Sequence, residues 1–164
     1  MKKFLLTLLA ALAVTAQAGN TITGAGATFP APVYSKWAGE YNKQTGVQLN
    51  YQPIGSGGGI KQIDAKTVDF GATDDPRKLE ELDAQKQVQF PVVKGGVVAV
   101  VNLDGITNNQ LNLSAKQLAD IFEGKYKNWR EVDAKLPNLS ITRVVRADSS
   151  GTTAVFSGYL ASRS

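Results

Sequence analysis

Apolar and polar side chains follow two different periods in the first third of the chain. Val33, Trp37 and Tyr41 recur at helical spacing and predict one apolar face of a helix, which Gly46 is placed to end. Residues 47–52 then alternate apolar with polar side chains, which is typical of a half-buried strand. We expect the aromatic side chains of the helix to face the core.

The same succession of strands and helices continues along the chain. A short strand is predicted at 21–23 and another at 68–72, and further helices are predicted at 60–65, 79–82 and 114–123. Ser114 and Gln117 form a capping-box pattern at the start of the last of these helices, and Gly124 is placed to end it. This order of elements predicts an α/β fold.

Two apolar stretches in the second half predict additional strands. Residues 90–103 are almost continuously apolar apart from the interruption at 94–96, which predicts two buried strands bent at the glycines, or one long kinked strand. Residues 141–145 predict a further strand, and the apolar positions within 154–161 predict a helix after it.

Three strands lead through a turn of small and hydroxyl-bearing residues into a helix. The hydroxyl groups belong to Thr28, to Ser56, and to Ser150 with Thr152. The first N–H groups of a helix have no partner within the helix, and the helix dipole favours negative charge there. Ligands of open α/β sheets lie at the carboxyl ends of the strands. If the turns converge, their N–H groups form a cage for a small oxyanion.

An arginine precedes the third turn. Arg146 carries a planar fork of donors that matches a phosphate or a carboxylate, and Asp148 is placed to hold that guanidinium. An ordinary capped helix with a surface Arg–Asp pair would give the same local sequence.

The glycine-rich turns do not match the common nucleotide or nucleophile motifs. Phe29 stands where a dinucleotide fingerprint needs its third glycine, and Lys61 follows Ile60 rather than the glycine of a P-loop. Ser56 is no nucleophile elbow, because Ile54 stands two residues before it. A flexible turn is the other interpretation of residues 55–59.

The N-terminal sequence predicts a signal peptide, and the composition argues against several classes of function. Residues 1–3 are positively charged, residues 4–14 are apolar, and residues 16–18 form a small-residue cleavage site, so we predict a signal peptide over 1–18 and export of the chain from Gly19. The net charge of +4 falls to +2 without Lys2 and Lys3, which gives no support to nucleic-acid binding. The chain has neither Cys nor His, so it lacks disulfides and the commonest catalytic bases and metal ligands.

Five segments now identify a family. They are Thr23–Pro32, Gly55–Gly59, Val68–Asp74, Ile121–Gly124 with Trp129, and Arg146–Thr152. In order and spacing they resemble the periplasmic phosphate-binding proteins of phosphate ABC importers, from Thr21 to about Leu160.

The resemblance implies a type II periplasmic-binding fold, in which two α/β lobes close on dehydrated phosphate. It implies no cofactor, metal or catalytic residue. The phosphate contacts that it implies are Thr28, Phe29, Ser56, Asp74, Arg146, Ser150, Gly151 and Thr152, with Asp148 orienting Arg146. Asp75 adjoins the predicted acidic contact, and the register of the preceding Gly71-Ala72-Thr73 favours Asp74.

Family members are about twice as long as this chain, so the resemblance implies an incomplete form that ends after the N-terminal half. The expected division is 19–75 for the first part of one lobe and 76–164 for the first part of the other. The implied role is extracytoplasmic binding of inorganic phosphate and delivery to the membrane permease of an ABC importer, by a protein that is a monomer when complete.

Two other functions are compatible with the residues alone. A metal-dependent phosphate-ester hydrolase could use Asp74 or Asp75, although Ser56 has no evident base. A non-binding envelope remnant is the other alternative.

Overall fold

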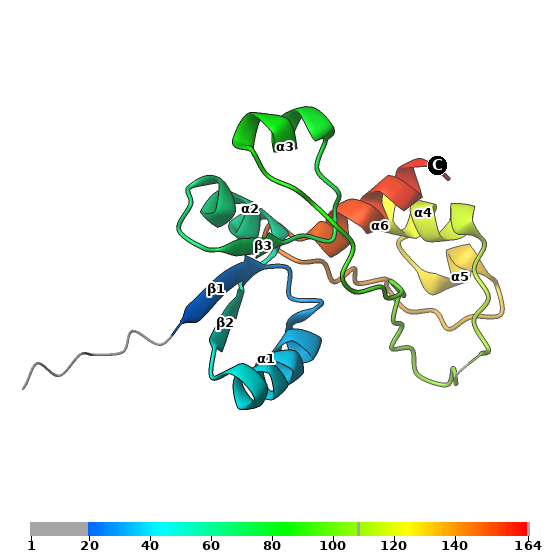
Figure 1. Ribbon diagram of the computed structural model, residues 1–164. Helices are drawn as coiled ribbons and strands as arrows, with labels where there is room; N and C mark the ends of the chain where they lie inside the picture. Colours follow the sequence, from blue (N-terminus) through cyan, green and yellow to red (C-terminus); the bar gives the residue numbers. More distant parts are fainter. Residues whose placement is uncertain (1–19, 108, 164) are drawn as a thin grey trace, which may run out of the picture.

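A computed structural model describes residues 20–107 and 109–163, so the predicted signal peptide lies outside the described residues. Strands and helices alternate at the start of the chain and helices follow (Figure 1). The elements are β1 (Thr21–Gly26), α1 (Ala31–Thr45), β2 (Gln48–Pro53), α2 (Ser56–Asp64), β3 (Phe70–Ala72), α3 (Leu79–Gln85), α4 (Ala115–Glu123), α5 (Trp129–Val132) and α6 (Gly151–Ala161).

The three strands form one parallel sheet in the order β2-β1-β3. The central strand β1 pairs Gly26 with Pro53 of β2 and with Ala72 of β3, so the carboxyl ends of all three strands lie at one edge. Helices α1 and α2 lie on opposite sides of this sheet (Figure 1). The fold therefore places the turn after β1 and the turn after β2 next to each other.

On each face of the sheet, close packing requires a glycine. A Cβ at Gly24 of β1 would lie 2.1 Å from Cζ of Phe70, because aromatic rings cover that face of the sheet. Tyr34 of α1 packs edge-on against Tyr51 of β2, with ring centroids 4.9 Å apart. On the other face, a Cβ at Gly59 of α2 would lie 2.4 Å from the Cα of Gly26. Helix α2 thus rests directly on the backbone of β1.

Helix α1 ends as the sequence predicts but packs less completely. Gly46 adopts a left-handed conformation with φ of 73°, and its N–H donates to the carbonyl of Asn42. The expectation that the aromatic stripe faces the core is wrong for two of its members, because Trp37 and Tyr41 are 50% and 43% exposed. A sheet of three strands offers apolar surface to only part of a helix of this length.

Helices α4, α5 and α6 form a second group, joined to the sheet by two long segments (Figure 1). The predicted capping box is present: the Ser114 hydroxyl accepts from the Gln117 N–H, and the Gln117 side chain accepts from the Ser114 N–H. Edge-on packing of Phe122 against Phe156, with centroids 4.8 Å apart, joins α4 to α6. The buried core of this group consists of Leu103, Ile121, Trp129, Val132 and Leu136.

Helix α3 is attached to α2 by polar contacts. The Arg77 guanidinium lies 2.7 Å from Oδ1 of Asp64 and 2.8 Å from Oε1 of Gln87. These bonds fix the start of the segment that leaves α3. No helix among the described residues has the length and apolar character that crossing a bilayer requires.

The predicted strands at 90–103 and 141–145 are wrong. Both segments are extended in Figure 1 but belong to no sheet. Within the described residues, the antiparallel bridge between Asn128 and Ser140 is the one isolated pairing outside the sheet. An apolar run supplies side chains suited to a buried strand, but a ladder also needs a paired neighbouring backbone, and neither segment pairs with a described strand.

Many side chains of these two segments are exposed, which corrects the prediction of buried strands at 90–103, although Leu103 at the end of that run belongs to the buried core. Val98 and Val100 are 78% and 89% exposed, and Val144 is 87% exposed. An apolar segment with unpaired backbone groups is a template for pairing with another chain.

We therefore expect the protein to self-associate at micromolar concentration, and Val100→Lys to reduce this association. A charge on an unpaired strand opposes edge-to-edge pairing. Leu79→Lys is the matched control, because Leu79 is 74% exposed but belongs to helix α3 and not to an unpaired extended segment. Sedimentation velocity measures the effect. A strictly monomeric parent, or an equal effect of the two substitutions, would contradict this expectation.

Candidate functional site

The three predicted anion turns come together at the carboxyl edge of the sheet. The turns after β1 and β2 are neighbours because their strands pair in parallel. The turn before α6 joins them although it is distant in sequence, because the Gly57 N–H at the start of α2 donates to the Ser149 carbonyl over 3.1 Å. Two helix N-termini, those of α2 and α6, therefore meet at one place.

Glycine makes this close approach of α2 and α6 possible. A Cβ at Gly57 would lie 2.1 Å from Oγ of Ser149. A Cβ at Gly151 would lie 2.4 Å from Oγ of Ser56 and 2.9 Å from Cβ of Asp74. The glycine-rich stretch at 55–59 is thus a tightly packed helix start, and the alternative of a flexible turn is wrong.

Arg146 joins the first turn to the third. Its Nε donates to Oδ1 of Asp148 over 2.8 Å and its Nη2 donates to Oδ2, so the pair is bidentate. Its Nη1 donates to the Thr28 hydroxyl over 3.3 Å. The interpretation of Arg146 and Asp148 as an ordinary surface pair therefore leaves out a contact that crosses 118 positions of sequence.

The ion pair shifts both of its members. The Arg146 guanidinium holds the pKa of the Asp148 carboxyl below its usual range, and Asp148 raises the pKa of Arg146. Because the carboxyl pKa is depressed in the folded protein, the pair stabilises the fold above the pKa of an unfolded Asp. That stabilisation is lost as the pH falls through the depressed value.

Asp74 belongs to the site and Asp75 does not contact it. The Asp74 N–H donates to the Ser56 hydroxyl over 3.3 Å, and the Thr152 hydroxyl donates to Oδ2 of Asp74 over 2.8 Å. Asp75 is exposed, and its backbone N–H bonds the hydroxyl of Thr73, its neighbour in the same turn. The structure thus places Asp74 in the cluster, and the choice of Asp74 over Asp75 as the phosphate contact stays a prediction.

Two predicted contacts, Ser150 and Phe29, do not join the cluster through their side chains. Ser150 is 8% exposed and caps α6, since its hydroxyl accepts from the Thr153 N–H over 3.2 Å. The Phe29 ring is turned toward Gly95 and is 44% exposed. Of the nine predicted site residues, the structure brings seven side chains or glycine positions into one cluster through the contacts given above: Thr28, Ser56, Asp74, Arg146, Asp148, Gly151 and Thr152.

Tyr51 is a residue that sequence reasoning missed. Its hydroxyl donates to the carbonyl of Ala27 over 2.6 Å, and its ring stacks on Phe70 at 5.8 Å between centroids. Burial raises the pKa of the Tyr51 hydroxyl, and the charges of Tyr34 and Asp74 add to this. The alternation at 47–52 places Tyr51 on the covered face, but nothing in that pattern indicates that its hydroxyl fixes the residue before Thr28.

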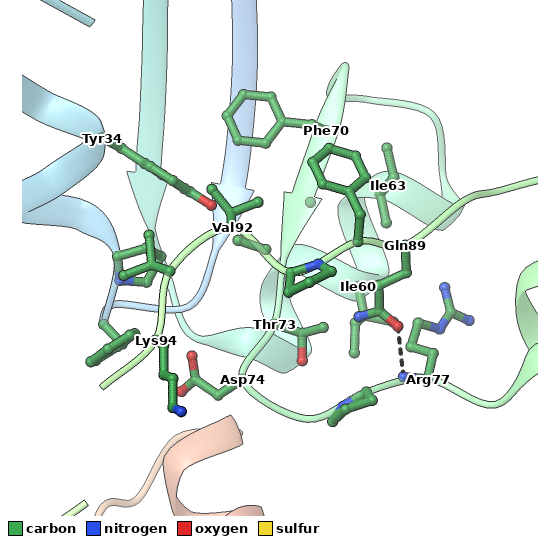
Figure 2. Close-up of a pocket in the computed structure, with 18 of the residues that line it drawn as sticks. Tyr34, Ile60, Ile63, Phe70, Thr73, Asp74, Arg77, Gln89, Val92 and Lys94 are labelled. Carbon is green, nitrogen blue, oxygen red and sulfur yellow. Dashed lines mark hydrogen bonds between the residues drawn. The ribbon is translucent and has the colours of Figure 1, made fainter. Parts of the chain in front are cut away.

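A cavity extends from the cluster along the sheet toward α3. Phe29, Asp74 and Thr152 line its end at the cluster, and Figure 2 shows Asp74 and Lys94 pointing into the same part of it. The described residues contain no group of three or more His, Cys, Asp or Glu side chains placed to hold a metal ion.

The amino-acid sequence matches one family model and several curated proteins. Residues 13–163 match the sequence pattern of the family described as PBP superfamily domain. The phosphate-binding protein PstS of Haemophilus influenzae is 55% identical over 148 residues, which are 86% of this chain and 44% of the relative. The phosphate-binding protein PstS of Pasteurella multocida is 54% identical over 160 residues, or 93% of this chain and 46% of the relative. The chain thus spans about half the length of these curated relatives.

A solved structure has a similar fold over most of this chain. It is a crystal structure of a Clostridium perfringens protein with bound phosphate, which superposes with a TM-score of 0.65 at 24% identity. The match covers 86% of this chain and 56% of that protein.

Proposed function

Because the chain belongs to the PBP superfamily, the family of periplasmic binding proteins, we infer that it binds inorganic phosphate at the cluster formed by the three turns. The single observation that carries this inference is the contact of Arg146 with the Thr28 hydroxyl, which joins a bidentate cation to the first anion turn. The names of its relatives, phosphate-binding proteins, give phosphate as the anion.

The cluster offers the donors that a phosphate ion needs. Arg146 supplies a planar fork of donors, and the starts of α2 and α6 supply backbone N–H groups. The hydroxyl groups of Thr28 and Ser56 add to these, because each accepts a hydrogen bond within the cluster and keeps its own O–H to donate. The Thr152 hydroxyl donates to Asp74, so Thr152 offers its backbone N–H at the start of α6. The Asp74 carboxylate is an acceptor, and it suits an oxygen of the ligand that carries a proton. The proposed phosphate contacts are those implied by the resemblance: Thr28, Phe29, Ser56, Asp74, Arg146, Ser150, Gly151 and Thr152, with Asp148 orienting Arg146.

The biological setting is part of the proposal. The chain acts outside the cytoplasm after cleavage behind Ala18, and delivers phosphate to the permease of an ABC importer. Residues 19–75 contribute to one lobe of the binding protein and residues 76–164 to the other. We favour phosphate binding over hydrolysis of phosphate esters because the relatives are named phosphate-binding proteins.

Calorimetric titration of the purified protein with inorganic phosphate tests the proposed function. We expect saturable binding of one phosphate per chain. Absence of binding would overturn the proposal and favour the non-binding remnant. Chelator-sensitive release of phosphate from an ester substrate would favour the hydrolase instead.

Removal of the Tyr51 hydroxyl should weaken phosphate binding without touching the ligand. Tyr51→Phe keeps the ring that packs against Tyr34 and Phe70, but it frees the Ala27 carbonyl next to Thr28. A hydrogen bond of this kind contributes about 1 kcal/mol, so we expect roughly a fivefold weaker affinity. Calorimetry with phosphate measures it, and Tyr41→Phe on the exposed side of α1 is the control, expected to leave the affinity unchanged. Equal affinities in the two variants would remove this role from Tyr51.

A further inference from the structure

Lys94 interrupts the apolar run between α3 and α4, and the function proposed above does not use it. It lines the same cavity as Asp74 and Thr152. Figure 2 shows its side chain directed to the part of the cavity where the Asp74 carboxylate lies. An ammonium group in an otherwise apolar stretch is thereby placed at the mouth of the proposed phosphate site.

The backbone at Lys94 is held against the first anion turn. A Cβ on the next residue, Gly95, would lie 2.3 Å from Cζ and 2.5 Å from Cε2 of Phe29. The Phe29 ring therefore packs directly on the main chain of Gly95. Since Phe29 immediately follows Thr28, this contact fixes the position of Lys94 relative to the turn that Arg146 also contacts.

The charges of the cluster and a bound anion are not balanced by Arg146 alone. The Arg146 guanidinium is already neutralised by its bidentate partner Asp148. Asp74 then contributes one uncompensated negative charge, which repels a phosphate ion at close range. Lys94 forms no ion pair with any residue that the structure describes, so its charge is available to offset that of Asp74.

We propose that Lys94 is a phosphate-binding residue, whose ammonium group contacts the bound anion from the side of the cavity and compensates Asp74. This inference rests on the proposed function, because it assigns a further contact to the same site. The ammonium is a compact charge with three donors on a flexible stem, so it can follow the anion as it enters.

The test is calorimetric titration with inorganic phosphate of the parent, Lys94→Gln, Lys94→Arg and Lys36→Gln. Lys36 is the matched control, because it is an exposed lysine of α1 outside the cavity. We expect Lys94→Gln to weaken binding by about tenfold or more, since it removes a charged hydrogen bond. Lys94→Arg should keep most of the affinity, and Lys36→Gln should stay within about twofold of the parent.

Salt dependence gives an independent readout. Because the lost interaction is electrostatic, the difference between the parent and Lys94→Gln should shrink as the ionic strength rises. Equal affinities of Lys94→Gln and Lys36→Gln in a parent that binds phosphate would overturn this inference alone. A parent that does not bind phosphate would overturn the proposed function and the role of Lys94 with it.

Discussion

Replacement of Arg146 by alanine is expected to weaken phosphate binding by about 10²-fold or more. Arg146 is the cation that contacts the first turn, and Asp148 holds its fork in place. Hydrogen bonds to charged groups contribute about 1.5–3 kcal/mol each, so the loss of two of them corresponds to at least a hundredfold change. The alanine variant also leaves the Asp148 carboxylate without its partner, beside the bound anion.

Two further variants sharpen this result. Arg146→Lys should not restore the affinity, because a point charge cannot reproduce the bidentate geometry with Asp148. Lys61→Ala removes a positive charge from α2 outside the cluster and should change the affinity little. Calorimetry with phosphate compares the variants. A parent-like affinity of Arg146→Ala would remove Arg146 from the site.

The second large effect is expected in the choice between phosphate and sulfate. A carboxylate beside an anion is repulsive unless the ligand carries a proton. One oxygen of Asp74 accepts from the Thr152 hydroxyl, whereas its Oδ1 accepts no hydrogen bond from a described residue and can accept from the P–OH group. Sulfate has no proton at neutral pH. A site built for such a hydrogen bond can reject the analogue that lacks it by about 10⁴-fold or more.

Asp74→Asn should therefore narrow the gap between the two anions, because the amide N–H groups of asparagine can face a bare oxygen. Asp75→Asn is the matched control, since the Asp75 backbone bonds Thr73 and its side chain is exposed. The measurement is titration of phosphate and of sulfate into the parent and both variants. The explanation fails if the parent binds sulfate as well as phosphate, or if Asp75→Asn shifts the ratio instead.

Local signals in the sequence predicted the helix ends well. The Ser114–Gln117 capping box and the helix ends at Gly46 and Gly124 are confirmed, since each depends on residues within one turn of the helix end. The type II periplasmic-binding fold that the resemblance implied is also confirmed, as an α/β arrangement with a parallel sheet that matches solved relatives.

Features that depend on distant partners were not predictable in the same way. The apolar run at 90–103 reads as a strand from its own residues, but pairing is decided by a neighbouring backbone. The exposure of Trp37 and Tyr41 follows from the narrow sheet beneath α1, which no spacing within the helix reveals.

In the candidate site too, the residue types were predictable from sequence, whereas the contacts between distant residues were not. Its residue types followed from hydroxyl-bearing turns and the resemblance. The hydroxyl of Tyr51 on Ala27 and the N–H of Gly57 on Ser149 follow only from the packing of strands and helices in space. Which of the predicted residues touch phosphate stays a prediction.

The position of bound phosphate tests the central claim most directly. A crystal structure of the protein grown with inorganic phosphate, and free of sulfate, gives that position. We predict phosphate between the starts of α2 and α6, with Arg146 donating to it and Asp74 accepting a hydrogen bond from its P–OH group, at distances of about 2.5–3.0 Å. Phosphate seated away from Arg146, or a cluster that stays free of phosphate at saturating concentration, would contradict the claim.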